Sequence, residues 1–329
     1  MKKILTTVIL AAILAAALCV SAGAETAGDV QWQGLTFAAD AEEIDLGETR
    51  VTDFAAFADM LEKLPKLKKV DMFETQVTRQ EIDMLGARFP EMDWGWTMVI
   101  RCSDGNHQIR TDQTAFSTLH NNKSPHHRSE DFAILKYCRH LFALDIGHNS
   151  VTSLDFLEDL PELRVLIIAC NEVTDISPLA KLTHLEYAEI FKNKITDITP
   201  VAGLTSLLDL NICFNHIKDL TPVQNMTWLK RLWMFSAQVY NQGYSEEVTR
   251  AFKAALPDTQ VDTTHYSTTG TWRYLGNEKN KHPHYAAIVA SFGDTHLRPK
   301  KAYVPFEDSH PFTAEEQAVI DAAQAQFGD

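Results

Sequence analysis

Apolar residues return at a fixed interval of 22 positions through the middle of the chain. Leucine fills one position of the pattern in five successive units, and other aliphatic residues or methionine fill the positions three and five residues further on. The leucine column consists of Leu141, Leu163, Leu185, Leu207 and Leu229. Each unit begins L-x-x-L-x-L-x-x-N, and the L-x-L alternation predicts a short strand with one buried face.

The second half of each unit predicts a compact return rather than another strand. Its apolar residues recur at every third position, which suits a 3₁₀-like or extended return. Pro178, Pro200 and Pro222 recur where the chain turns and interrupt regular hydrogen bonding there. Because no single unit can bury its apolar edge alone, we expect stacked units that share one core. The sequence therefore predicts an α/β solenoid.

An asparagine follows the predicted strand at the same place in four units. Backbone groups at this place leave the sheet but remain buried, and a carboxamide offers both a donor and an acceptor to satisfy them. We therefore expect a structural asparagine ladder rather than a set of ligand-binding residues. Its members are Asn149, Asn171, Asn193 and Asn215.

Weaker copies of the unit flank the regular ones. The segment 44–52 resembles 144–152, and the segment 67–77 resembles 229–239. The units at 67–77 and 229–239 lack the asparagine, and each continues into a predicted amphipathic helix. These two helices are expected over residues 80–88 and 246–256.

Another irregular strand is expected near residues 116–122. A predicted helix over residues 130–139 follows it, and Ser129 is the expected N-cap because a serine hydroxyl can accept a hydrogen bond from the first turn.

The repeated residues resemble those of the leucine-rich repeat family. The stretches 171–179 and 193–201 are similar to the 22-residue bacterial subclass found in internalin-type surface proteins, and the resemblance covers residues 141–239. It implies a right-handed superhelix with a parallel β-sheet on the concave face and short 3₁₀, extended or helical returns on the convex side. It implies no particular ligand, because members of the family bind many different ones.

The strand positions between the buried residues are expected to face the concave surface. Aromatic side chains gather there in the later turns together with acidic and basic ones, and exposed aromatic patches commonly mark interfaces. We expect a protein or peptide partner, or a cell-surface glycan, to bind this face. The alternative is that the segment 94–130 or the C-terminal tail folds over the face and buries it. The predicted contact residues are Tyr187, Glu189, Phe191, Asp209, Phe214, Arg231, Trp233 and Phe235.

The first 24 residues have the pattern of a secretory signal peptide. Two lysines precede an apolar run from Ile4 to Val20, and small residues place the expected cleavage after Ala24. A secreted or loosely surface-associated protein, not spanning a membrane, is the expected product. Retention of the segment as an anchor is the alternative, although a bilayer span needs about 20 apolar residues.

The remaining chain divides into four predicted parts. Residues 25–93 form an N-terminal cap with irregular repeats, and residues 94–130 form an insertion or junction. Residues 131–262 contain the regular repeats and a C-terminal helical repeat. Residues 263–329 are interpreted as a cap and tail, because the last apolar face of a solenoid needs a cover.

The net charge and the lack of catalytic motifs limit the classes of function that we expect. The chain has 30 Lys and Arg against 44 Asp and Glu, a formal net charge of −14, which argues against a nucleic-acid partner. No common catalytic motif is present, so we expect a non-catalytic binding protein without cofactor or metal. His126 and His127 are interpreted as solvated loop residues rather than metal ligands. The alternatives are a cell-envelope spacer without a soluble ligand, or repeats that carry a small catalytic tail.

The repeat register also constrains the cysteines. Cys170 and Cys213 lie two turns apart, which corresponds to about 9.6 Å between their strands. A disulfide needs Cα atoms closer than about 7 Å, so both are expected to be free thiols. Cys102 and Cys138 lie outside the strict register, and a bridge between them stays open.

Overall fold

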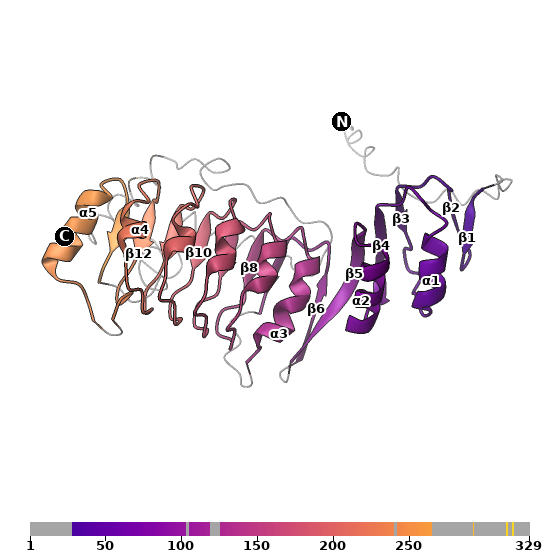
Figure 1. Ribbon diagram of the computed structural model, residues 1–329, viewed down its shortest axis with the longest axis horizontal. Helices are drawn as coiled ribbons and strands as arrows, with labels where there is room; N and C mark the ends of the chain where they lie inside the picture. The colour runs from indigo at the N-terminus through magenta and orange to yellow at the C-terminus, as the bar shows by residue number, and fades with distance from the viewer. Residues whose placement is uncertain are drawn as a thin grey trace, which may run out of the picture.

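The computed structural model describes residues 28–102, 105–118, 126–239 and 242–264, with the single residues 292, 314 and 318 (Figure 1). The predicted signal peptide lies outside these residues. The described part is an elongated stack, with short strands along one side and helical returns along the other. None of the helices in the described ranges has the length and apolar character needed to cross a membrane.

The regular repeats form a parallel sheet of seven strands in the described chain, arranged in sequence order. Residues 22 apart pair directly, so that Tyr187 lies beside Val165 on one strand and Asp209 on the other. This register confirms the predicted parallel sheet, and the first strand confirms the irregular strand expected near residue 116. The strands are β7 (Ala115–Ser117), β8 (Ala143–Asp145), β9 (Val165–Ile167), β10 (Tyr187–Glu189), β11 (Asp209–Asn211), β12 (Arg231–Trp233) and β13 (Gln260–Asp262).

The returns are compact, as their three-residue spacing predicts. The recurring prolines occupy the first or second position of three of them, where a missing backbone N–H costs nothing. The last return is a full α-helix, capped by the Ser245 hydroxyl, which accepts from the Val248 backbone N–H. The returns are η2 (Asp155–Asp159), η3 (Ser177–Lys181), η4 (Thr199–Val201), α4 (Thr221–Gln224) and α5 (Glu246–Ala255).

Each ladder asparagine is buried and links neighbouring turns through side-chain hydrogen bonds. Nδ2 of Asn171 donates to the carbonyls of Ile146 and Ile168, both at 3.0 Å. Its Oδ1 accepts from the Val151 backbone N–H of the preceding turn at 3.0 Å. Asn193 and Asn215 make the equivalent bonds one and two turns later.

The residue before each ladder asparagine has a left-handed backbone. This conformation turns the chain sharply out of the strand, and it costs a residue other than glycine roughly 1–2 kcal/mol. None of these four residues is a glycine, so each turn carries this cost, and Ser236 shares it at the same place in the next unit, before Ala237. Their φ values are 58° at His148, 56° at Cys170, 54° at Lys192, 50° at Phe214 and 55° at Ser236.

The N-terminal part builds a separate sheet. A hairpin of β1 (Val30–Trp32) and β2 (Leu35–Phe37) precedes it. The helices of this part are α1 (Phe54–Leu61) and α2 (Arg79–Arg88), the second within one residue of its predicted start. The four strands of the sheet, counted over the described residues, are β3 (Glu43–Asp45), β4 (Lys69–Gln76), β5 (Asp93–Cys102) and β6 (Gly105–Arg110).

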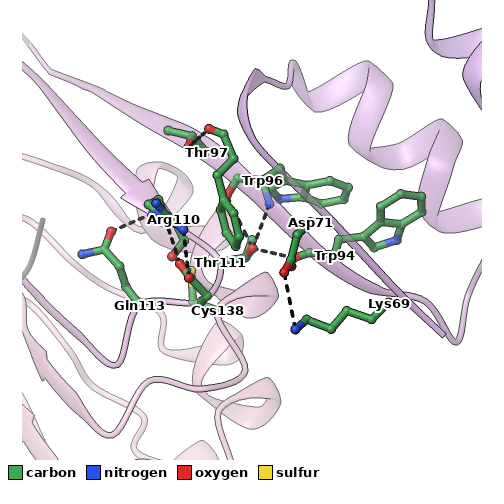
Figure 2. A network of polar contacts seen from close by, with 11 residues as sticks. Lys69, Asp71, Trp94, Trp96, Thr97, Arg110, Thr111, Gln113 and Cys138 are labelled. Atoms are coloured by element: carbon green, nitrogen blue, oxygen red, sulfur yellow. Dashed lines mark hydrogen bonds and ion pairs between the residues drawn. The ribbon is translucent and has the colours of Figure 1, made fainter. Parts of the chain in front are cut away.

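The segment 94–130 supplies the last strands of one sheet and the first strand of the next. β5 starts parallel to β4 and then forms an antiparallel hairpin with β6. Thr111 closes the hairpin, because its hydroxyl donates to the Trp94 carbonyl and accepts from the Trp96 backbone N–H (Figure 2). The junction is therefore built from strands.

The predicted helix over 130–139 is only partly correct. The chain forms one α-helical turn, α3 (Ser129–Phe132), and then the 3₁₀ helix η1 (Ala133–Tyr137). The prediction of Ser129 as N-cap is wrong, since its hydroxyl accepts instead from the backbone N–H groups of Thr152 and Ser153, both at 2.9 Å. The hydroxyl of Ser129 therefore bonds to the next turn of the solenoid rather than to its own helix.

One apolar core runs through both sheets, from Val30 to Val261. At the junction the fully buried Trp96 ring stacks on Trp94, with centroids 5.2 Å apart, and meets the edge of Tyr137 at 5.6 Å. This confirms the expected shared core and extends it to the irregular repeats.

The described cysteine side chains are free thiols. Cys170 and Cys213 are unbridged, as the strand spacing requires, and Cys138 is free as well, so it forms no bridge with Cys102. Burial raises the pKa of the Cys138 and Cys213 thiols, which makes both poor nucleophiles.

One of the two expected loop histidines is not solvated. The side chain of His127 is 1% exposed and packs beside Phe132, with ring centroids 5.3 Å apart. Burial lowers the pKa of its imidazole, because charging it would require water that the site excludes.

Candidate binding face

Three adjacent strands bring the predicted contact residues together on the concave side. The register of β10, β11 and β12 aligns Tyr187, Asp209 and Arg231 in one column across the sheet. A second column, two residues further along each strand, contains Glu189, Asn211 and Trp233. Because alternate residues of a strand share a face, both columns lie on the same side of the sheet.

The aromatic residues that follow these strands extend the same face. Phe191, Phe214 and Phe235 are half-buried and pack against the side chains of the two columns. The rings of Phe214 and Phe235 meet edge to face, with centroids 5.6 Å apart. This geometry is favourable for aromatic pairs and holds the two rings in place.

Three charged residues of the face have hydrogen-bond partners within it. The Arg231 guanidinium donates to both carboxylate oxygens of Asp209, with Nη2 and Oδ2 3.1 Å apart. The Tyr187 hydroxyl donates to the Glu189 carboxylate. Asp209 is fully buried, so its ion pair is a structural part of the face rather than a charge presented to solvent.

The expectation of an exposed face is wrong. Four of the predicted contact residues, Tyr187, Glu189, Asp209 and Trp233, are buried, and the other four are half-buried. Side chains on strands only about 4.8 Å apart pack side by side and remove one another from water. They join a second apolar cluster on the concave side, here called the concave cluster: Ala115, Phe142, Ala143, Val165, Ile167, Ala169, Tyr187, Cys213 and Trp233.

A residue from far along the chain also contacts this cluster. Phe292, from the predicted tail, is half-buried and packs against it. This contact fits the alternative in which the tail covers part of the face.

Sequence reasoning missed two features of the face. The first is that the face is apolar in its early turns, at Ala143, Val165 and Ile167. The signal in the sequence was the presence of apolar residues at positions expected to lie on the surface. The second is Asn211, which is 1% exposed. Its Oδ1 accepts from the Cys213 backbone N–H, whereas its Nδ2 has no hydrogen-bond partner. A buried donor without an acceptor costs about 1–3 kcal/mol.

In the part of the chain that the structure describes, no three His, Cys, Asp or Glu side chains come together as a metal site would require.

Comparisons with known proteins agree with the repeat pattern. Residues 139–181 match the family model described as Leucine Rich repeats (2 copies). No curated protein matches the chain.

Several solved structures are similar in part. An internalin from Listeria monocytogenes is 17% identical, with 68% of this chain and 54% of that chain covered and a TM-score of 0.36. Internalin C2 from the same organism is 21% identical, with 68% and 80% covered and a TM-score of 0.37. A leucine-rich repeat protein from Leptospira interrogans is 17% identical, with 62% and 50% covered and a TM-score of 0.35.

This chain spans about half the length of the first of these internalins. The 22-residue period, the parallel strands in register and the match over residues 139–181 together show that these repeats form a leucine-rich repeat solenoid.

Proposed function

We propose that this chain is an exported, non-catalytic binding protein that recognises a protein or peptide through its concave face. Stacked repeats create extended concave surfaces that are well suited to this use. Export rests on the signal pattern of residues 1–24, and the absence of a common catalytic motif supports a role in binding rather than catalysis.

The observation that carries the proposal is the composition of the concave face. The half-buried rings of Phe191, Phe214 and Phe235 line it, and Phe292 already packs there as an aromatic side chain from outside the repeats. An extended peptide with an aromatic side chain offers a group that matches these rings.

A capture experiment tests the proposal. Biotinylated protein comprising residues 25–329 is incubated with a surface extract of host or neighbouring cells, beside a Phe191→Ala/Phe235→Ala variant. These residues are preferable to Tyr187 and Trp233, whose burial makes their replacement a test of folding. A partner bound by the wild type and lost in the variant supports the concave face.

The matched control is Val239→Ala/Val248→Ala, which shortens two exposed apolar side chains elsewhere. It should retain the partner. Equal capture by the concave variant and the control would count against the proposal.

The burial of the face favours a second candidate, a cell-envelope spacer without a soluble ligand. A spacer should bind isolated cell walls equally well with and without the Phe191 and Phe235 substitutions, and it should capture no soluble partner.

A further inference from the structure

One strand of the solenoid is not followed by a helical return. From β3 to β12, each strand of the two parallel runs in the described chain leads into a helix or 3₁₀ turn, except β5. After β5 the chain turns back into the antiparallel strand β6 instead. The convex layer therefore passes from α2 directly to α3 and η1, with β5 running between them (Figure 1).

A cleft of about 570 Å³ lies at this place. Its floor includes Val99 and Ile100 of β5, and its apolar walls include Ile82 of α2 and Ile134 and Tyr137 of η1. Elsewhere neighbouring convex elements pack together, as α1 does with α2 and η1 with η2. The cleft thus occupies the position that the missing return of β5 would fill.

The backbone around the cleft favours a helix over a strand as its occupant. Strand addition needs an unpaired sheet edge, but β5 is paired with β4 on one side and β6 on the other. A helix satisfies its own backbone and needs only an apolar face, which the floor and walls supply. Helices of the convex layer already lie on both sides.

The charges at the rim of the cleft indicate which charge the partner helix should carry. The Asp131 carboxylate accepts from the Arg128 backbone N–H, and Lys136 lies over the Tyr137 ring at 5.1 Å. Arg79 and Asp83 stand one turn apart on α2, where their charges offset each other. Glu130 has no ion-pair partner among the described residues, so a basic side chain on an incoming helix would complement it.

We propose that this cleft is a second interaction site, separate from the concave face, which receives an amphipathic helix of a partner protein. The helix takes the place of the missing convex return, with apolar side chains one turn apart against Val99 and Ile134. A lysine or arginine beside them faces Glu130.

Two constrained helical peptides test the proposal with the protein comprising residues 25–329. Both carry leucines at positions i and i+4, and they differ only in flanking lysines or flanking glutamates. Fluorescence anisotropy should show saturable binding of the lysine peptide, at least about tenfold tighter than the glutamate peptide. Methyl NMR signals of Ile82, Val99 and Ile134 should shift, while those of Val165 and Ile167 on the concave face stay in place.

Substitutions at the rim distinguish the cleft from general electrostatic attraction to an acidic protein. Glu130→Lys should remove or reverse the preference for the lysine peptide. Glu162→Lys, which makes the same change at an exposed position beyond η2, should leave the preference unaltered. Ile134→Gln should weaken both peptides.

Three results would overturn the proposal: no saturable binding of either peptide, shifts at Val165 and Ile167 instead of the cleft, or an unchanged preference in Glu130→Lys.

Discussion

At the scale of single residues, each regular turn depends on two neighbouring positions, of which the first destabilises the fold and the second stabilises it. The left-handed residue bends the chain and is strained, whereas the asparagine after it satisfies backbone groups that the bend would leave unpaired. The repeat pattern in the sequence identified the asparagine. It could not identify the strained position, because His148, Cys170, Lys192 and Phe214 share no side-chain property.

Replacing one ladder asparagine should be costly. Asn171→Ala leaves the carbonyls of Ile146 and Ile168 and the N–H of Val151 without their partner, and should lower the free energy of unfolding by about 1–3 kcal/mol. Urea denaturation measures this change. Asn225→Ala, at an exposed position on the convex side, is the control and should change little. Equal effects of the two substitutions would refute a structural ladder.

Removing strain at one turn should stabilise the protein. Lys192 is exposed and has a φ of 54°, so Lys192→Gly relieves a backbone cost and loses little packing. We expect a gain of about 0.5–1 kcal/mol. Lys218→Gly, at an exposed position without positive φ, should be neutral or destabilising. Thermal melts of the wild type and the two variants measure these changes. A melting temperature of Lys192→Gly below that of the wild type would contradict the predicted stabilisation.

At the scale of elements, the sequence predicted what local periodicity controls. The 22-residue period located the strands β8 to β12, and amphipathic spacing located α2 and α5 to within about one residue. The β5–β6 hairpin lies in the segment 94–130, for which the sequence predicts an insertion or junction because the period is interrupted there. The break of the 130–139 helix after Phe132 was missed because Ser129 bonds to the following turn, a contact between residues 23 and 24 positions apart.

The contact between β4 and β5 makes one glycine necessary. A Cβ built on Gly95 would collide with Asp71 Oδ1 and lie 2.7 Å from Phe73 Cζ and 3.1 Å from Asp71 Cα. Gly95→Ala should therefore destabilise the protein by about 1–3 kcal/mol through overpacking. The control is Gly203→Ala, where a Cβ meets nothing within 4 Å, and it should be neutral or slightly stabilising. Equal decreases in the denaturation midpoints of Gly95→Ala and Gly203→Ala would show that β4 and β5 are packed less tightly than described.

At the scale of the whole molecule, one core joins two sheets that share no strand pairing in the described residues. The sequence predicted the shared core, since every unit leaves an apolar edge for its neighbour. It gave burial of the concave side chains as the alternative rather than as the expectation. The period determines which residues face that side, but Phe292 lies outside the repeats and follows no register.

Trp96 should couple the two sheets in unfolding. Its fully buried ring contacts Trp94 on one side and Tyr137 on the other, so Trp96→Ala removes the central contact of the junction at a cost of about 3–5 kcal/mol. In the wild type, unfolding followed by tryptophan fluorescence and by far-UV circular dichroism should coincide; in the variant the two curves should separate.

Trp228→Ala controls for the loss of a large ring away from the junction. Trp228 lies partly buried against the core, and its Nε1 donates to the Leu204 carbonyl. This variant should lower the midpoint and keep the two curves together. Coincident curves for Trp96→Ala as well would argue that the sheets are coupled by other contacts.

The separation of the two sheets has a consequence for a molecule under mechanical load. Within each sheet, tension along the long axis is carried by rungs of backbone hydrogen bonds, one after another. Between β6 and β7 no such rung exists in the described chain, and the load falls on the packing around Trp96 and Tyr137. Within each sheet neighbouring strands are held by hydrogen bonds and apolar packing together, whereas between the sheets strand pairing is lacking in the described chain and packing bears the load. When the molecule is stretched between its two ends, we therefore expect it to part first at this seam, as two intact blocks joined by the chain that links β6 to β7.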